Sequence, residues 1–485
     1  MSGLSRLVFP ALRWRARTGF SHEGRRIDET LRLGVGGYLL FGGPAEAVRA
    51  LTRELNQAAP HPLLLAADCE RGAAQQFPDL THLPPPAALG FIGQPELTAR
   101  CGAITAREAL SVGVNWVYAP VADLDLEPEN PIVQTRSFGD DPEAVARQVT
   151  AWITAAEGAG VVTSVKHYPG HGRTAVDSHA TLPVVPEPPE TLRADLLPFA
   201  RAVAAGARSV MSAHVAYSAW DPSGVPASLS PTILGHLRSD LGFDGVVVSD
   251  ALIMEGAVRG RGEQQAVVQA VAAGVDALLY PRDAPSAIRA LEAGVGGALA
   301  RARADQAISS ISRLAETVGS PGSGVVPPPD AGAEHATFAD AVADLALHTL
   351  RGEQLRLREP LEILVVDDDV GGPYAVGRRD LFALALRSAG IRLVAAPRAG
   401  PEAPAGAARV VLIYAEPRSW KGRASLGPRS TDALRRHLPQ ASLVVLFGHP
   451  RLLHQIGGEA PVLCAFHGQP LMQQAAARWV VGRMT

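Results

Sequence analysis

Residues 163–183 read Thr-Ser-Val-Lys-His-Tyr-Pro-Gly-His-Gly-Arg-Thr-Ala-Val-Asp-Ser-His-Ala-Thr-Leu-Pro. The β-branched run at 161–165 predicts a short buried strand that ends at Lys166 and His167. A glycine-rich loop follows this strand and carries a carboxylate and a second imidazole. Polar groups at the end of a buried strand, next to a loop that can move, are typical of a site that binds and then reacts.

Lys166 is unusual in this composition. The chain has 45 lysine and arginine residues, of which only Lys166 and Lys421 are lysines. A compact ammonium differs from the planar, forked guanidinium in what it can bind. A lysine at the end of this strand, in a chain that otherwise uses arginine, therefore indicates a point-charge site.

The composition is that of a globular protein with a large core. The 485 residues are 47% hydrophobic and 19% charged, and the formal net charge is −3, which gives no reason to expect nucleic acid or a membrane as partner. Cys69, Cys101 and Cys464 are odd in number and far apart, which argues against disulfides or a metal cluster. We expect no cofactor and no metal. With no signal peptide or apolar span visible, we expect a cytoplasmic location.

The first part of the chain alternates between short apolar runs and alanine-rich, helix-compatible stretches. Such alternation predicts parallel strands with helical crossovers, and eight runs in about 280 residues predict a (β/α)8 TIM barrel. Several runs end in polar residues, as expected where the active site of a barrel forms. The predicted strands are Leu7–Leu12, Gly37–Phe41, Leu63–Ala67, Val114–Pro120, Val161–Val165, Ser209–His214, Gly245–Ser249 and Ala277–Tyr280.

A second α/β pattern follows a stretch rich in glycine and proline. We predict a catalytic barrel over 1–318, a linker over 319–339 and a smaller α/β sandwich domain over 340–485. The acidic start of the second pattern is similar to that of a phosphoacceptor receiver domain. That fold needs an acceptor aspartate after its third strand, where this chain has Ala415-Glu416, so we favour the sandwich.

Asp250 ends the run Gly-Val-Val-Val-Ser-Asp and is followed by Ala-Leu-Ile-Met-Glu-Gly. An aspartate on rigid backbone at a strand end can act as a nucleophile or stabilise a developing cation. Retaining glycosidases pair such a carboxylate with a nearby proton donor. The best donor in this chain is His179, because imidazole titrates near neutral pH and Asp177 can stabilise its cation.

These motifs together resemble those of glycoside hydrolase family 3, in its β-N-acetylglucosaminidase branch. The resemblance implies that Asp250 is the nucleophile, that His179 is the acid/base and that Asp177 supports this histidine. It covers roughly residues 1–315, and the tail is similar, more loosely, to the second domain of larger members.

The resemblance also implies four sugar ligands. Arg136 opens Arg-Ser-Phe-Gly-Asp-Asp-Pro, a motif whose arginine binds sugar in the family, as do the residues matching Lys166 and His167. Asp68 matches the aspartate that grips hydroxyls at the non-reducing end. One position departs from the pattern: Gln76 stands where the family has an arginine that reaches the sugar, and only Arg71 is close enough in sequence to compensate.

Three functions remain open at this point. The first is a retaining, exo-acting β-N-acetylglucosaminidase that hydrolyses small cell-wall or chitin-derived saccharides. The second is a β-glycoside phosphorylase, or a β-glucosidase, of the same family. The third is a sugar-binding protein without activity, which the presence of the nucleophile and the acid/base disfavours. The sequence does not define the sugar, the oligomeric state or the contribution of the second domain to the site.

Overall fold

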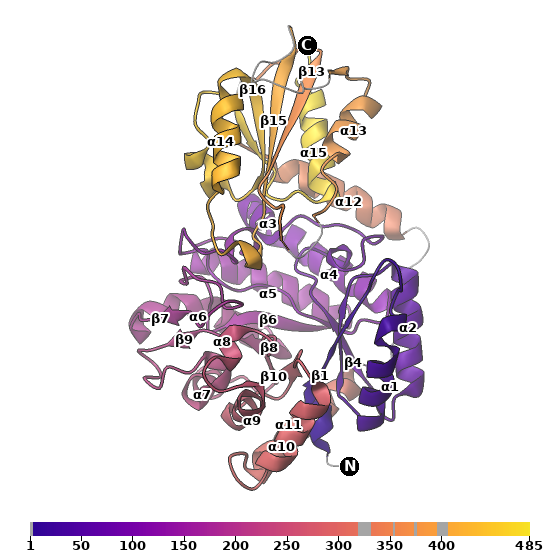
Figure 1. The fold of residues 1–485 in the computed structure, drawn as a ribbon, viewed down its shortest axis with the longest axis vertical. Coiled ribbons are helices and arrows are strands. Elements are labelled where there is room, and N and C mark those ends of the chain that lie inside the picture. Colours follow the sequence, from indigo (N-terminus) through magenta and orange to yellow (C-terminus); the bar gives the residue numbers. More distant parts are fainter. Residues whose placement is uncertain (1–2, 319–330, 353–354, 373–375, 395–405) are drawn as a thin grey trace.

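The computed structural model describes residues 3–318, 331–352, 355–372, 376–394 and 406–485. A barrel of parallel strands wrapped by helices forms the first part, and a smaller three-layer α/β sandwich packs against it (Figure 1). This architecture confirms the predicted fold class.

Each apolar run predicted as a barrel strand overlaps a strand of the barrel. The strands pair in parallel in the order β2-β3-β4-β5-β6-β8-β10. The ring closes because β1 pairs with β11, and Val248 of β10 bridges to Ala277, directly before β11. The bounds are β1 (Val8–Phe9), β2 (Ala11–Arg13), β3 (Gly37–Phe41), β4 (Leu64–Ala67), β5 (Trp116–Val117), β6 (Val162–Tyr168), β8 (Ser209–Ser212), β10 (Val246–Ser249) and β11 (Leu278–Leu279).

The barrel helices begin where the sequence supplies start signals. Pro142 opens α5, and the side chain of Asp141 accepts the N–H of Ala144 at 2.7 Å, which satisfies one free donor of the first turn. The bounds are α1 (Gly24–Leu33), α2 (Ala45–Ala58), α3 (Pro86–Ile92), α4 (Pro95–Ser111), α5 (Pro142–Gly158), α6 (Pro189–Ala204), α7 (Pro231–Ser239), α8 (Glu255–Val258), α9 (Glu263–Ala273), α10 (Ala284–Gly294) and α11 (Arg301–Thr317). Strands β7 (Val184–Val185) and β9 (Ala216–Tyr217) form a small separate sheet.

The second domain is a six-stranded sheet in the order β12-β17-β16-β15-β13-β14, parallel except for β12. Helices α13 and α15 pack on one face of this sheet and α14 on the other (Figure 1). The bounds are β12 (His348–Arg351), β13 (Leu361–Asp367), β14 (Leu393–Val394), β15 (Ala408–Ala415), β16 (Ala441–Gly448), β17 (Val462–Cys464), α12 (Ala331–Ala346), α13 (Leu381–Ser388), α14 (Pro428–His437) and α15 (Pro470–Val481).

Two features of this region differ from the sequence prediction. The predicted linker 319–339 falls in part outside the described residues, and the remainder, 331–339, is the first half of α12 rather than an extended segment. The proline-rich run ends at Pro329, and the alanine-rich stretch after it favours a helix. The sequence analysis also missed β12, a half-buried edge strand with no clear alternation of polar and apolar residues. The domain boundaries themselves stay a prediction.

The apolar core of the barrel continues into α12 and into part of the second domain, which also has two buried clusters of its own. Phe338 and Val342 of α12 belong to the same buried cluster as the barrel residues, and so do Phe466 and Met472 near α15. Polar contacts add to this interface, such as the 2.6 Å hydrogen bond from Gln469 Nε2 to the backbone oxygen of Leu83. The orientation of the second domain on the barrel is therefore determined by direct packing.

A buried ion pair links two strands of the second domain. Glu362 on β13 and Arg409 on β15 are register partners, 0% and 1% exposed, with Arg409 Nε 2.6 Å from Glu362 Oε2. Arg409→Met leaves a buried carboxylate without its cation, so we expect a loss of about 3–5 kcal/mol in unfolding free energy. Urea unfolding of the full chain measures this loss. The double variant Glu362→Leu/Arg409→Met, with neither charge, should recover most of it, and an unchanged single variant would contradict the prediction.

Candidate active site

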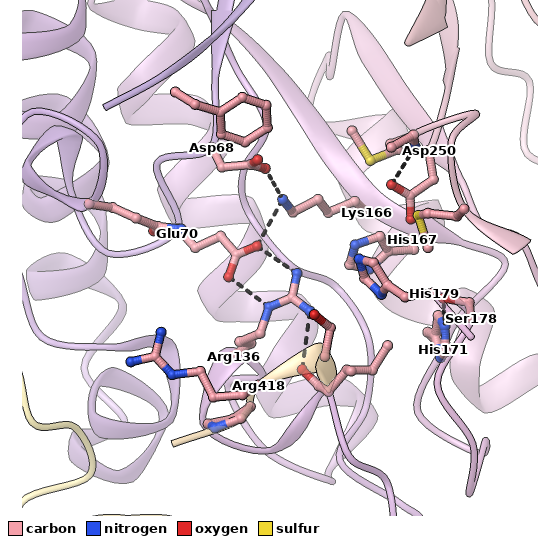
Figure 2. A pocket seen from close by; sticks show the side chains of 18 of the residues that line it. Asp68, Glu70, Arg136, Lys166, His167, His171, Ser178, His179, Asp250 and Arg418 are labelled. Atoms are coloured by element: carbon pink, nitrogen blue, oxygen red, sulfur yellow. Dashed lines mark hydrogen bonds and ion pairs between the residues drawn. The ribbon is translucent and has the colours of Figure 1, made fainter. Parts of the chain in front are cut away.

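The carboxyl ends of the barrel strands open into a pocket of about 610 Å³. Asp68 follows β4, Lys166 and His167 end β6, and Asp250 follows β10. These four side chains point into the pocket together with Arg136 from the 3-10 turn Gln134–Arg136 and His179 from the loop after β6 (Figure 2). Asp177 lies behind His179 and does not line the pocket. The structure thus brings all the sequence-predicted site residues together.

Lys166 is the centre of a buried charge network. Its Nζ donates to Asp68 Oδ1 at 2.7 Å and lies 2.8 Å from Glu70 Oε1 (Figure 2). Arg136 binds the same Glu70 carboxylate through Nε at 2.9 Å and Nη2 at 2.7 Å. Burial opposes the charge on each group, but the carboxylates raise the pKa of Lys166, and Arg136 and Lys166 hold the pKa of Glu70 well below its usual range.

Asp123 fixes the orientation of His167. The buried carboxylate accepts His167 Nδ1 at 2.7 Å on one oxygen and the backbone N–H groups of His167 and His171 on the other, at 3.1 and 2.7 Å. Burial opposes the ionisation of Asp123, but His167 and His171 lower its pKa. Because a carboxylate only accepts, Nδ1 of His167 carries a proton, and Nε2 is the nitrogen left for a substrate.

The loop after β6 carries the predicted acid/base. His179 Nδ1 lies 2.7 Å from Asp177 Oδ1, and the backbone N–H of His179 donates to the same oxygen at 2.8 Å. The His179 side chain is 49% exposed, whereas Asp177 is buried. Partial burial disfavours the imidazolium, but the hydrogen bond to Asp177 and the charge of Asp250 raise the pKa of His179. Nδ1 is occupied, so Nε2 can exchange a proton with a group in the pocket.

His171 ties this loop to the strand that precedes it. Its Nδ1 lies 2.7 Å from Thr174 Oγ1 and its Nε2 lies 3.0 Å from Ser178 Oγ. Burial lowers the pKa of His171 to about 4, so the ring is neutral at pH 7. A neutral ring between two hydroxyls holds the loop in place next to the reactive pair.

Asp250 is the carboxylate of the pocket that no ammonium or guanidinium binds in the described part of the chain. The backbone N–H of Ala251 donates to its Oδ1 at 2.7 Å. Burial opposes ionisation, but His167, His214 and His179 lower the pKa of Asp250 to about 2. Asp250 is therefore ionised at neutral pH and free to attack an electrophile. His214 itself is buried, bonded to Ser228 Oγ at 2.7 Å, and does not line the pocket.

The second domain forms one wall of the pocket. Residues 416–420, directly after β15, line it together with His467. Arg418 donates to Glu416 Oε2 at 2.6 Å, and Lys421, the second lysine of the chain, bonds to Asp369 Oδ1 at 2.6 Å. Lys421 also donates to the backbone oxygen of Glu416 at 3.0 Å, so these bonds tie the loop to its own domain while residues 416–420 face the pocket.

Arg71 and Gln76 both line the pocket. Burial lowers the pKa of Arg71, while the carboxylates of Glu416 and Glu70 act to raise it. Gln76 Oε1 accepts the N–H of Gly42 at 3.2 Å. Compensation by Arg71 for the missing arginine stays a prediction.

Within the described residues, no group of three or more His, Cys, Asp or Glu side chains is arranged to hold a metal ion. No helix in the same part of the chain is both long and apolar enough to cross a membrane.

Comparison with known proteins identifies the family. Residues 24–314 match the model of the glycosyl hydrolase family 3 N-terminal domain. The chain belongs to glycosyl hydrolase family 3. A β-N-acetylglucosaminidase/β-glucosidase of Cellulomonas fimi is 32% identical over 377 residues, which are 72% of this chain and 66% of that protein. A β-hexosaminidase of Thiobacillus denitrificans is 38% identical over 270 residues, which are 53% of this chain and 73% of that one.

Solved structures agree with this assignment. The family 3 β-N-acetylglucosaminidase from Paenibacillus sp. str. FPU-7 superimposes with a TM-score of 0.86 at 26% identity, covering 100% of this chain and 96% of that one. A β-glucoside phosphorylase shares the fold with a TM-score of 0.88 at 22% identity, covering 100% and 92%. The protein is thus a glycoside hydrolase of family 3 and acts on a saccharide.

Several residues that build this glycosidase site were given no role in it from the sequence. Glu70 and Asp123 were visible as acids after strands, but nothing in the sequence showed that they bind Lys166 and His167. His171 lies within the motif but outside the predicted reactive set. Glu416 comes from a distant domain, and only the three-dimensional contact reveals it.

The loop after β6, which carries Asp177 and His179, has no space for a side chain at Gly172. A Cβ added there would lie 1.7 Å from the backbone oxygen of Leu124, so Gly172→Ala must displace the loop that carries Asp177 and His179. We expect kcat/KM on an aryl β-glycoside to fall by about 10²-fold, the usual effect of misplacement by about 1 Å, with an unchanged circular dichroism spectrum. Gly158→Ala is the matched control, since no atom lies within 4 Å of its added Cβ. Equal activity of the two variants would contradict the prediction.

Proposed function

We propose that the protein is a retaining, exo-acting β-N-acetylglucosaminidase that works through a covalent glycosyl-aspartate intermediate. The observation that carries the proposal is the pairing, in one pocket, of the ionised carboxylate of Asp250 with the carboxylate-supported imidazole of His179. The names of the relatives support the sugar, because they include β-hexosaminidases and a β-N-acetylglucosaminidase/β-glucosidase.

In the first step of the proposed reaction, an oxygen of Asp250 attacks C1 of the sugar and the bond from C1 to the leaving oxygen breaks. His179 gives its Nε2 proton to that oxygen, so the leaving group departs as a neutral alcohol. In the second step His179 takes a proton from water while the water oxygen attacks C1, which releases Asp250 and the free sugar. Asp177 accepts Nδ1–H throughout and stabilises the imidazolium between the steps.

The sugar ligands proposed from the family are Asp68, Arg136, Lys166 and His167. Lys166 and Asp68 are hydrogen-bonded to each other, which places a donor and an acceptor side by side for a pair of sugar hydroxyls. Exo-action is the part of the proposal that rests on Asp68, which matches the family's ligand for hydroxyls at the non-reducing end. Small cell-wall or chitin-derived saccharides are the proposed substrates, and a role in peptidoglycan turnover belongs to the same proposal.

One observation supports a β-glycoside phosphorylase as a second candidate. The proton donor is an imidazole, so once it has given up its proton it does not repel an incoming phosphate as a carboxylate would. In that case phosphate replaces water in the second step and the product is a sugar 1-phosphate. Turnover of aryl β-GlcNAc and aryl β-glucoside with and without phosphate, with analysis of the products, separates hydrolase from phosphorylase and GlcNAc from glucose.

The nucleophile can be identified by trapping. A fluorinated glycoside with a good leaving group should form a slowly hydrolysed ester with Asp250, because fluorine destabilises the cationic transition state of the second step. Peptide mass spectrometry should find the label on Asp250, and Asp250→Asn should abolish labelling and nearly all turnover. Label on Glu255 or Asp68 would refute the assignment.

The acid/base can be identified by comparing the activity loss of a variant on substrates with good and with poor leaving groups. Proton donation contributes roughly 10²–10⁴-fold, so His179→Ala should lose about that much on disaccharides but far less in glycosyl-enzyme formation from nitrophenyl glycosides, which leave without a proton. Equal losses on both substrates would place the acid elsewhere.

The pH profile gives an independent test of Asp177. Its carboxylate raises the pKa of His179, and the first step needs protonated His179. The alkaline limb of kcat/KM should therefore move to lower pH in Asp177→Asn, because the weaker partner holds the proton less firmly. An unmoved limb would show that Asp177 does not act on the acid.

A further inference from the structure

The pocket has a second wall that the proposed reaction does not use. Two rows of strand ends connect Asp68, after β4, with Asp250, after β10. One row runs through β5, β6 and β8 and includes the charged cluster around Lys166. The other row includes the ends of β2, β3 and β11, which contribute Arg13, Phe41 and Tyr280 to the pocket lining.

Arg13 is held rigidly in this wall. Its guanidinium carbon lies 3.9 Å from the centre of the Phe41 ring and 5.3 Å from that of Tyr280. Its Nε donates to the Tyr280 hydroxyl at 3.1 Å. Among the described residues, no carboxylate forms an ion pair with Arg13 and no acceptor binds its two Nη groups. The two Nη groups of Arg13 are therefore held in a fixed orientation at the pocket, with their N–H donors available to a ligand.

Gln76 is connected to this wall through the backbone. Its Oε1 accepts the N–H of Gly42, which directly follows Phe41, the ring on which Arg13 stacks. Gln76 is the position where the family pattern has a sugar-binding arginine, so a neutral amide stands there. Of the three side chains that this wall contributes to the pocket lining, Arg13 is the one that carries a positive charge.

The shape of a pyranose decides which part of the sugar meets Arg13. With C1 at Asp250 and the opposite end at Asp68, one edge of the ring carries the substituents of C2 and C3, and the other carries the ring oxygen and C6. The charged cluster around Lys166 suits the edge with two polar substituents. The aromatic wall suits the edge made of the ring oxygen and the C5–C6 carbons, so the group on C6 points to Arg13.

We propose that Arg13 selects a sugar that carries an anionic oxyacid group on C6, either a carboxylate or a phosphate monoester. A guanidinium with two free Nη groups binds such a group through paired, charge-assisted hydrogen bonds, which a neutral hydroxymethyl group cannot match. The inference rests on the proposed function for the placement of C1 at Asp250, and it adds the class of sugar that the site prefers.

The test uses two pairs of aryl β-glycosides that differ only at C6: GlcNAc with its 6-phosphate, and glucose with glucuronic acid. The quantity measured is the ratio of kcat/KM for the anionic member to that for the neutral member. We expect the ratio in the unmodified protein to exceed one by about 10- to 100-fold for at least one pair, the usual strength of a hydrogen bond to a charged group. The pair that shows the effect distinguishes phosphate from carboxylate.

Variants assign the preference to Arg13. Arg13→Gln should return the ratio to near one, and Arg13→Lys should keep part of it, since charge is retained without the fork. Arg17→Gln is the matched control, an exposed arginine outside the pocket lining that should leave the ratio unchanged. If Arg13→Gln does not fold, Tyr280→Phe, which removes the hydroxyl that accepts Nε, should lower the ratio.

A ratio near one for both pairs in the unmodified protein overturns the inference, and so does a raised ratio that Arg13→Gln leaves intact. Failure of the proposed function gives a different result. In that case the N-acetylated pair is not cleaved, while the glucose pair still reports the effect of C6 and of Arg13.

Discussion

The arrangement of the active site depends on one desolvated ammonium. Lys166 is buried between Asp68 and Glu70, and Glu70 in turn is bound by Arg136, so three segments of the chain meet in a row of alternating charges. Each member would be costly to bury alone, and the row persists because every charge has a partner. A network of this kind fixes the positions of Lys166 and Arg136 in the pocket before any substrate arrives. It also explains why the chain uses a lysine here, since a planar guanidinium cannot present one point to two carboxylates.

A second constraint fixes the reactive side. Asp123, with no exposed surface, accepts the backbone N–H groups of His167 and His171, and His171 bonds to Ser178, which lies between Asp177 and His179 in the sequence. The loop after β6 is thus connected by side-chain bonds to the strand that carries Lys166. The residues proposed for sugar binding and those proposed for proton transfer are therefore held by one set of contacts.

The barrel was predictable because its strands are buried on both sides. Each strand therefore appears in the sequence as a continuous run of apolar residues. The meeting of Asp68, Lys166 and Asp250 in one pocket was predictable because each ends or follows a parallel strand, and the carboxyl ends of barrel strands meet at one face. Other residues were not, since their roles are set by contacts over long sequence distances: Asp123 meets His167, and Glu416 reaches the pocket from another domain. The edge strand β12 was missed for a related reason, because half-buried edges carry a weak pattern.

The wall at 416–420 belongs to the second domain's own ion-pair cluster, while Asp250 and His179 belong to the barrel. The two sides of the cleft are therefore encoded in different modules. The side chains after β15 can therefore be replaced without touching the barrel residues that hold Asp250 and His179. The shape of this wall can vary independently of the arrangement of the barrel side of the pocket.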